Sequence, residues 1–244
     1  MFHRHPTLNL RAVAWIGCVA VMMTRAVTFA AEPVIEGITF AVEPGKIYVP
    51  LDEAIEVLRL QIVKDVAGNC KQIADVAIPA GSLRRLTDRT ELVSTVDLQN
   101  MGVAVTAEPE GNRVKVGEGR RDFVLIVSPK RAEVSLAGQQ LRAWQGTRLV
   151  LQSRVSSGRR GSTPAGDFHA GPYKARFHRS SRYHFAPMPW SVQINGHVFI
   201  HGFTSVPKYP ASHGCIRVPL NEGNPARFFH EWIDVGTPVR VTRD

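Results

Sequence analysis

One cysteine and two histidines near the C-terminus have the types and the spacing that nucleophilic catalysis requires. Cys215 stands in the run Ser212-His213-Gly214-Cys215-Ile216-Arg217, and His201 precedes it by fourteen residues. A sulfur nucleophile needs a base within hydrogen-bond reach and donors aimed at the oxyanion that forms. The pKa of a free cysteine is about 8.5, so an imidazole or an ion pair must activate the thiol near neutrality. The residue types therefore indicate acyl transfer through Cys215.

Two histidines are candidates for the base. His213 lies two residues before Cys215, and side chains at that spacing in an extended segment project to the same face. His201 follows a separate apolar strand at 197–200, from which it approaches the thiol more freely. Spacing alone leaves both open. Gly214 has no Cβ, so the backbone N–H groups of Gly214 and Cys215 can turn into a site and form an oxyanion hole.

Each remaining residue of the motif has two possible interpretations, one functional and one purely structural. Arg217 is suited to clamp a substrate carboxylate, or it is a solvated surface arginine. Ser212 contacts the substrate, or it only caps the turn. Cys215 itself has two rival readings, a buried structural cysteine and a zinc ligand together with His201 and His213. No carboxylate or second cysteine completes a known zinc spacing, so we predict no metal and no cofactor.

The elements that must position these residues are mostly strands. From residue 123 onward, short apolar or alternating runs are separated by Gly, Pro and Ser, which favours a β-sandwich or barrel. The runs are FVLIVSP, AEVSLAG, LVLQSRVSSG and HVFIHG. One clear helix is predicted over 224–233, with Pro225 in its first turn, and a closing strand over 239–241. We therefore expect a mostly β C-terminal domain with one or two short helices.

Charge and histidine content divide the chain near residue 120. Residues 32–120 carry 10 basic and 14 acidic residues, whereas residues 121–244 carry 17 basic and 7 acidic residues. Seven of the nine histidines lie from His169 onward, so chemistry that titrates near neutral pH is confined to the second part. A basic surface suits polyanionic surroundings such as nucleic acid, carboxylate-bearing peptidoglycan stems or anionic wall polymers, or it only aids solubility. No nucleic-acid-binding motif is present, so we predict no nucleic-acid partner.

The first 31 residues have the features of a secretory signal. A basic segment with Arg4 and Arg11 precedes the apolar run of residues 12–23, and Thr28-Phe29-Ala30 provides small residues for cleavage. Arg25 is atypical there and leaves a retained N-terminal membrane anchor as the alternative. We expect an exported protein, in the periplasm or cell wall.

Export leaves two cysteines in the mature chain. Cys70 and Cys215 lie in different halves of the mature chain. In an oxidising compartment two cysteines can form one disulfide. The Ser-His-Gly-Cys turn favours a reactive thiol instead. We therefore expect Cys70 and Cys215 to be unpaired.

The first half of the mature chain contains two copies of one pattern. A short strand, a helical segment and a β-hairpin begin at Tyr48-Val49-Pro50-Leu51 and again at Leu92-Val93-Ser94-Thr95. The arrangement resembles the stalk-type domain of the copper amine oxidase N-terminal family, and no histidine there is available for copper. We expect a small α+β domain over 32–118, either a spacer or wall-binding module or a folding adjunct, followed by the catalytic domain over 121–243.

The second half is similar to the YkuD-type L,D-transpeptidases. The resemblance is carried by four ordered segments: the motif His201-Gly202 … Ser212-His213-Gly214-Cys215-Ile216-Arg217, the run GSTPAGDF at 161–168, Met188-Pro189-Trp190, and VGTPV at 235–239. A departure from the family is the unusually basic segment RFHRSSRYHF at 176–185. The interval from His201 to Cys215 is also on the short side.

The resemblance implies a role for each position of the motif. Cys215 is the nucleophile, and His201 is the general base and acid, oriented through a backbone carbonyl near Gly202. His213 supports the turn, and Ser212 and Arg217 help bind the donor. The backbone N–H groups of Gly214 and Cys215 form the oxyanion hole, with that of His213 as a further candidate. The implied activity is peptidoglycan cross-linking, in which a tetrapeptide stem forms a thioester that an amine acceptor resolves. An L,D-carboxypeptidase with water as acceptor, the attachment of another amine such as a wall-bound protein, and a non-catalytic wall-binding protein are the alternatives.

Overall fold

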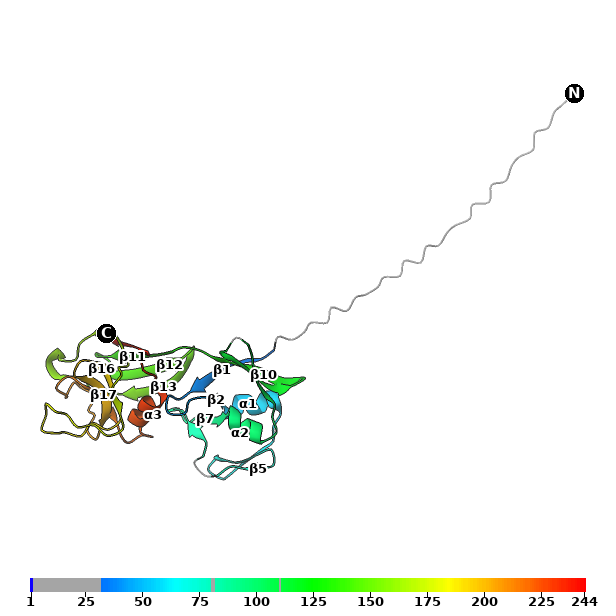
Figure 1. Cartoon of the computed structure of the whole chain (residues 1–244), viewed down its shortest axis with the longest axis horizontal. Helices are drawn as coiled ribbons and strands as arrows, with labels where there is room; N and C mark the ends of the chain where they lie inside the picture. Colours follow the sequence, from blue (N-terminus) through cyan, green and yellow to red (C-terminus); the bar gives the residue numbers. More distant parts are fainter. Residues whose placement is uncertain (2–31, 80–81, 110) are drawn as a thin grey trace. The chain divides into compact units, whose positions relative to one another are not determined.

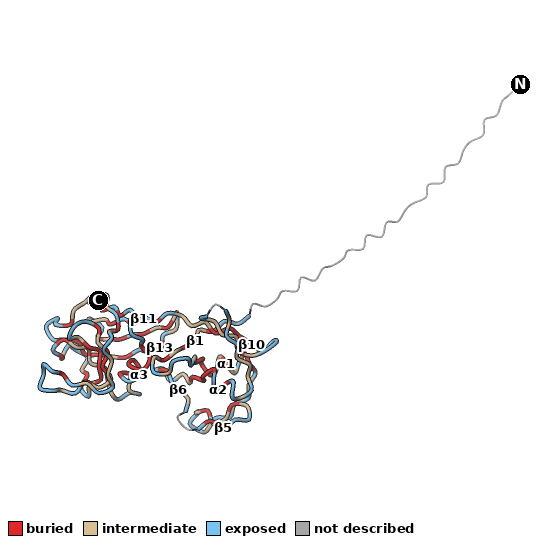
Figure 2. The backbone as a smooth tube through the Cα atoms, viewed as in Figure 1, coloured by how far each residue is buried: buried red, intermediate tan, exposed pale blue. Residues whose placement is uncertain are grey.

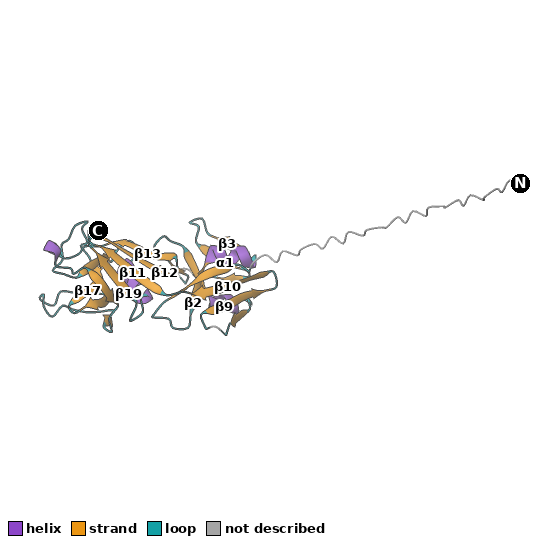
Figure 3. Ribbon diagram, turned by 90° about the horizontal axis from the view of Figure 1, so that it is seen from above, coloured by secondary structure: helices purple, strands orange, loops and turns teal. Residues whose placement is uncertain are grey.

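The computed structural model describes Met1 and residues 32–79, 82–109 and 111–244. The predicted export signal at residues 2–31 therefore lies outside the described residues. Strands dominate the described part (Figures 1 and 3), and the predicted mostly β class is confirmed. No helix within these ranges is long and apolar enough to cross a membrane.

The repeated pattern of the first half forms a seven-stranded sheet, a separate small sheet that contains β3 (Ile62–Lys64) and β4 (Cys70–Ile73), and two helices. The first copy runs through β2 (Ile47–Pro50), α1 (Leu51–Leu58), β3 and β4, and the second through β7 (Glu91–Ser94), α2 (Thr95–Asn100), β8 (Val105–Ala107) and β9 (Arg113–Glu118). The order of the seven-stranded sheet is β6-β7-β2-β1-β10-β9-β8, with β1 at Val34–Thr39, β6 at Arg84–Arg85 and β10 at Arg121–Val127. The two copies meet because β2 and β7 pair antiparallel.

The helices of this half form for identifiable local reasons. Helix α1 turns Leu51, Ala54 and Leu58 into the core, and its last turn ends at Arg59 in the left-handed region, with φ 57°. Helix α2 begins at a cap, where the Ser94 hydroxyl accepts a hydrogen bond of 3.0 Å from the N–H of Asp97. Both helices therefore follow from sequence signals within or beside them.

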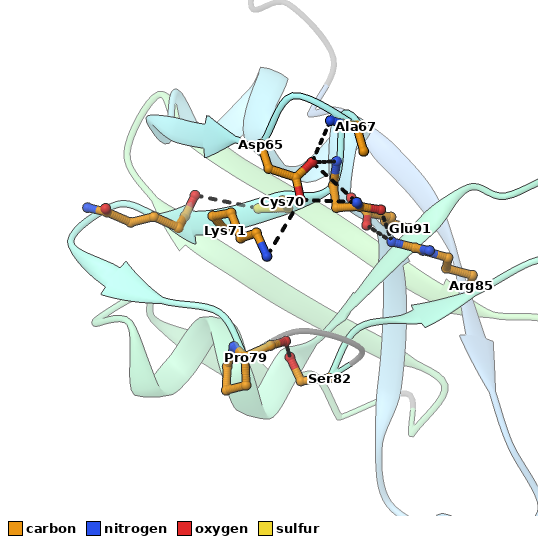
Figure 4. A network of polar contacts seen from close by, with 10 residues as sticks. Asp65, Ala67, Cys70, Lys71, Pro79, Ser82, Arg85 and Glu91 are labelled. Atoms are coloured by element: carbon orange, nitrogen blue, oxygen red, sulfur yellow. Dashed lines mark hydrogen bonds and ion pairs between the residues drawn. The ribbon is translucent and has the colours of Figure 1, made fainter.

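A small three-stranded sheet of β3, β4 and β5 (Val76–Ala77) is closed by a turn centred on Asp65 (Figure 4). The Asp65 carboxylate accepts from the side-chain amide of Asn69 at 3.2 and 3.1 Å and from the backbone N–H groups of Asn69 and Ala67 at 2.8 and 3.0 Å, and these bonds lower its pKa. The neighbouring Cys70 is 5% exposed, and burial raises the pKa of its thiol. Both Cys70 and Cys215 are free, as expected.

The second half has two sheets. The first has the order β13-β12-β11-β19-β14, and the second β15-β16-β17-β18. Their bounds are β11 Lys130–Ser135, β12 Gln140–Gln145, β13 Arg148–Arg154, β14 Gly166–His169, β15 Lys174–Ala175, β16 Ser191–Asn195, β17 Val198–Phe203, β18 Ile216–Pro219 and β19 Pro238–Thr242. The predicted helix is α3 (Pro225–Trp232), capped by the Asn224 side chain, and the predicted closing strand is β19. A short 3-10 turn covers Arg159–Gly161.

The main apolar core lies under these two sheets and against α3 (Figure 2). Phe229, Trp232 and Ile233 are fully buried there, with Ile200 and Ile216 from β17 and β18. Burying side chains of this size contributes about 1.5–3 kcal/mol each. This core fixes the face of the four-stranded sheet from which the motif residues point away.

The strand expected to open the catalytic domain belongs to the first sheet. β10 pairs parallel with β1 and antiparallel with β9, so residues 121–127 hydrogen-bond to the strands of the first half. Residues 32–244 cluster as one compact unit. The division into 32–118 and 121–243 stays a prediction, and the pairing of β10 favours a boundary after Val127.

An ion-pair network joins β6 to α3. Arg84 contacts the carboxylates of both Glu43 and Glu231, the latter at 3.0 Å, and Glu231 also pairs with Arg227 at 2.7 Å. The side chains of Arg84 and Glu231 are 25% and 12% exposed. The network therefore ties the first half of the chain to the helix that supports the motif strands.

We expect Arg84→Ala to lower the free energy of unfolding by about 1–3 kcal/mol, because it removes a shared cation from two partly buried carboxylates, of which Glu231 keeps Arg227 and Glu43 keeps only the more distant Lys46. The neighbouring Arg85 is the matched control. Its ion pair with Glu91 is 47% exposed on the arginine side, so Arg85→Ala should cost about 0–1 kcal/mol. Urea unfolding measures both variants, and equal losses would show that the Arg84 network carries no special stability.

Candidate active site

The parallel pairing of β17 with β18 brings the two parts of the motif together. Its register places Ile200 opposite Ile216 and His201 opposite Arg217. Side chains alternate along a strand, so His201 and Arg217 share the face opposite to the two buried isoleucines. Cys215 immediately precedes β18 and lies two residues before Arg217, so it projects to that same side. The charge of Arg217 accordingly acts on the pKa of both His201 and Cys215.

His201 is buried, oriented and uncharged. Its side chain is 4% exposed, and Nδ1 lies 2.9 Å from the carbonyl oxygen of Gly202. A carbonyl only accepts, so Nδ1 carries the proton and Nε2 is left as an acceptor. Burial lowers the pKa of His201 to about 4, and the charge of Arg217 acts in the same direction. A neutral imidazole with a free Nε2 is the form that can remove a proton at neutral pH.

The backbone carbonyl of Gly202 orients this imidazole. Its own N–H donates to the Pro189 carbonyl at 2.7 Å. A Cβ at Gly202 would lie 2.4 Å from Cδ2 of Leu220 and 3.2 Å from the Pro189 carbonyl oxygen. The close approach of these neighbours explains a glycine at this position.

The thiol of Cys215 is also uncharged. It is partly buried and points to the carbonyl of His197, with Sγ 3.6 Å from that oxygen. Burial raises the pKa of the thiol, against the opposing effects of a hydrogen bond with the Phe199 backbone and the charge of Arg217. A thiol with a raised pKa is protonated near neutral pH, and it would need a base in order to act as a nucleophile.

Two buried hydroxyls brace the turn before Cys215. The Ser212 hydroxyl accepts from the N–H of Gly214 at 3.0 Å and donates to the Cys215 carbonyl at 2.5 Å. Thr163 accepts from the N–H of Gly158 at 2.7 Å and donates to the Gly214 carbonyl at 2.8 Å. In this structure the Ser212 hydroxyl stabilises the turn, which is the structural interpretation of this residue. A Cβ at Gly158 would lie 2.9 Å from Cα of Gly214, so the two segments pack at glycine distance.

The same bonds change the expected oxyanion hole. The N–H of Gly214 is used by Ser212, so it is not free to meet an oxyanion in this conformation. The N–H of Cys215 makes no hydrogen bond within the described part of the chain. Of the N–H groups of Gly214 and Cys215, only that of Cys215 therefore remains available.

His213 is held by other partners. Its Nε2 lies 3.0 Å from Nη2 of Arg159, and its ring stacks on Tyr183 with 4.4 Å between centroids and 14° between planes. Arginine only donates, so Nε2 of His213 is occupied as an acceptor. This geometry gives His213 a supporting place and leaves His201 as the better candidate for the base.

Arg217 lies on the reactive face beside His201. Its guanidinium is 4.1 Å from the centre of the Phe203 ring. Burial lowers the pKa of Arg217, and the nearby charge of Arg159 adds to this effect. The structure shows no ion pair for Arg217 among residues 32–79, 82–109 and 111–244. It is therefore a partly buried cation rather than a fully solvated one.

A pocket of about 200 Å³ opens beside the thiol. It is lined by Cys215, Gly214 and His213, by Met188, and by residues to which the sequence assigned no role in the site: Ser162, His178, Ser180, Ser181, Arg182, Tyr183, His197, Val198 and Phe199. His201, Ser212 and Arg217 do not line it. For the lining residues within 176–185, the only signal was the unusual basic composition of that segment, whereas the others belong to the segments GSTPAGDF and Met188-Pro189-Trp190 and to the predicted strand HVFIHG.

A larger groove of about 930 Å³ lies elsewhere, between α1, the Asp65 turn, the β6–β7 hairpin and the segment before α3. Its lining contains no cysteine or histidine, so the larger volume does not mark the candidate chemistry. No group of three or more His, Cys, Asp or Glu side chains within the described residues is arranged to hold a metal ion.

Comparisons with known proteins agree with the motif. Residues 129–241 match the YkuD family, described as the L,D-transpeptidase catalytic domain. No curated protein matches the chain. An L,D-transpeptidase structure from Xylanimonas cellulosilytica is 30% identical over 48% of this chain and 61% of its own, with a TM-score of 0.40.

Two further structures have lower identity. An L,D-transpeptidase from Stackebrandtia nassauensis is 22% identical over 48% of this chain and 57% of its own, with a TM-score of 0.43. L,D-transpeptidase 1 of Mycobacterium tuberculosis is 17% identical over 88% of this chain and 100% of its own, with a TM-score of 0.40. The chain spans less than two thirds of the first two structures. The family match confirms the resemblance seen in the motifs: residues 129–241 are similar to the YkuD family, whose model describes the L,D-transpeptidase catalytic domain.

Proposed function

We propose that this chain is a peptidoglycan L,D-transpeptidase in which Cys215 carries the acyl group. The observation that supports this most strongly is the β17–β18 register, which sets a buried neutral His201 on the same sheet face as the Cys215 thiol. The donor is a tetrapeptide stem, and the acceptor is an amine of a second stem. The export predicted from residues 1–31 would place the enzyme in the periplasm or cell wall, where this substrate is found.

The first half-reaction forms a thioester. Sγ of Cys215 attacks the carbonyl carbon between the third residue and the terminal D-alanine while Nε2 of His201 takes the thiol proton. The N–H of Cys215 is the available donor for the resulting oxyanion. Collapse of this intermediate breaks the C–N bond, and His201 returns its proton to the departing D-alanine nitrogen. His201 is neutral again, and the acyl group remains on sulfur.

The second half-reaction releases the acyl group. The acceptor amine attacks the thioester carbonyl, His201 takes the proton from the amine nitrogen, and the C–S bond breaks to give a new amide. The proton then passes from His201 to the Cys215 thiolate. The neutral form of His201 is needed at the start of both halves, which agrees with its lowered pKa.

The nucleophile is tested by the two described cysteines. We expect wild type and Cys70→Ala to gain the mass of one carbapenem, with the adduct on the peptide that contains Cys215, because Cys70 is 5% exposed and its thiol pKa is raised. Cys215→Ala should gain no mass. Intact and peptide mass spectrometry read both results, and an adduct that persists on Cys215→Ala would reject the assignment.

The acceptor is tested on sacculi. Incubation with the wild-type enzyme should produce new cross-links between third stem residues, because the proposed acceptor is an amine. Analysis of the released muropeptides would show these dimers and their absence with Cys215→Ala. Trimmed tripeptides without dimers would instead identify water as the acceptor, and an L,D-carboxypeptidase.

The buried His201 predicts a dependence of stability on pH. Its pKa is about 4 when folded and near 6.5 when unfolded, so between these values the unfolded chain binds more protons than the folded one. Stability contributed by the neutral form is therefore present above pH 6.5 and is lost as pH falls toward 4, by roughly 2 kcal/mol between pH 7 and pH 5.

His201→Gln isolates this contribution, since the other titrating groups are the same in both proteins. We expect wild type to lose roughly 2 kcal/mol more than His201→Gln between pH 7 and pH 5 in urea unfolding. Equal losses in the two proteins would contradict a histidine that is buried in its neutral form.

A further inference from the structure

The segment from Arg176 to Trp190 folds back on itself and forms an arm beside the candidate site. Three backbone hydrogen bonds join its two sides, from the N–H groups of Trp190, Met188 and Ser180 to the carbonyls of Arg176, His178 and Ala186, at 2.9, 2.8 and 3.0 Å. At the tip, the Ser180 hydroxyl accepts from the N–H groups of Arg182 and Tyr183 at 3.3 and 3.2 Å. The tip therefore has a defined shape rather than that of an open loop.

The tip contacts the turn that carries the nucleophile. Tyr183 stacks on His213, two residues before Cys215, and Arg159 holds the same histidine through Nε2. Arg182 and Tyr183 from the tip line the 200 Å³ pocket together with Cys215. The arm thus places a cation in the wall of the pocket into which the thiol opens.

The charge of this pocket is positive. Arg182 is the one arginine or lysine in its lining, and no aspartate or glutamate lines it. The other two arginines of the arm are engaged: the Arg176 guanidinium lies 5.1 Å from the Trp190 ring, and Arg179 donates to the Phe185 carbonyl at 3.2 Å. The structure shows no ion pair or side-chain hydrogen bond for Arg182 within residues 32–79, 82–109 and 111–244.

We propose that Arg182 determines donor specificity by binding a free carboxylate of the acyl donor in this pocket. The inference rests on the proposed function, because it needs an acyl donor at Cys215. A guanidinium offers two parallel N–H donors that match a carboxylate, and the pocket has no acidic side chain to compete for them. Ser180 and Ser181 line the same wall and add hydroxyl groups near the ligand.

A stem peptide offers this carboxylate from two sources. One is the C-terminal carboxylate of the D-residue that leaves, and the other is a side-chain carboxylate on the third residue. Binding of the first would favour tetrapeptides over C-terminally amidated donors. Binding of the second would favour stems whose third residue is not amidated.

Three synthetic donors separate these sources: a tetrapeptide with both carboxylates free, the same peptide with a C-terminal amide, and the same peptide with an amidated third side chain. Acylation of Cys215 is followed by intact mass at several donor concentrations, which separates the half-saturating concentration from the maximal rate. The proteins are wild type, Arg182→Gln, Arg182→Lys and Arg142→Gln. Arg142 is an exposed arginine on β12 that does not line the pocket, so it is the matched control.

With the free donor, Arg182→Gln should raise the half-saturating concentration by about tenfold to a hundredfold, the range for a hydrogen bond to a charged group. Arg182→Lys should recover part of this, and Arg142→Gln should equal wild type. Wild type should discriminate against one of the two amidated donors, and Arg182→Gln should lose that discrimination. The donor concerned identifies the carboxylate.

Other results overturn the inference. If Arg182→Gln raises the half-saturating concentration of all three donors equally, or lowers only the maximal rate, then Arg182 maintains the shape of the arm and does not bind a carboxylate. If wild type accepts the three donors equally, the pocket reads no carboxylate. Failure of the proposed function gives a different result, because wild type would then form no acyl-enzyme with any donor.

Discussion

The parallel pairing between β17 and β18 is the constraint on which the candidate site depends. Ile200 and Ile216 are opposite each other and buried, so the register is held by the apolar core against α3. A shift of one residue would turn His201 toward the core and an isoleucine toward the thiol. His201 and Cys215, the proposed base and nucleophile, are fourteen residues apart in sequence and therefore share one face because two isoleucines share the other.

Burial then sets the form in which the chemistry begins. The pKa of His201 is lowered and that of Cys215 is raised, and loss of solvent is the largest cause of both shifts. The resting pair is a neutral imidazole and a neutral thiol rather than an ion pair. The Gly202 carbonyl fixes the tautomer in which Nε2 of His201 can accept a proton.

Much of this architecture was predictable because its signals are local. Pro225 and Asn224 predict the start of α3, the repeated strand, helix and hairpin patterns predict the first sheet, and the ordered motifs predict the catalytic domain. The preference for His201 over His213 first came from family resemblance. The structure adds a physical reason, since His213 is occupied by Arg159 and Tyr183, whereas Nε2 of His201 has no hydrogen-bond partner among the residues that the structure describes.

Other features were not predictable because they depend on contacts between distant segments. The hydrogen bond from the Gly214 N–H to the Ser212 hydroxyl depends on the three-dimensional shape of the turn. The hydrogen bond from Thr163 to the Gly214 carbonyl joins residues that are 51 positions apart in the sequence. The stacking of Tyr183 on His213 requires the arm to fold back first. Strand β10 has the composition of a catalytic-domain strand, and only its pairing with β1 and β9 assigns it to the other sheet.

The central claim is that His201 is the base for Cys215, and the rate of Cys215 acylation at pH 7 tests it most directly. Carbapenem acylation would be timed by intact mass in wild type, His201→Gln and His213→Gln. If His201 removes the thiol proton, His201→Gln should slow acylation by about a hundredfold or more, and His213→Gln should slow it much less. A His201→Gln enzyme that acylates as fast as wild type, or a greater loss in His213→Gln, would contradict the account.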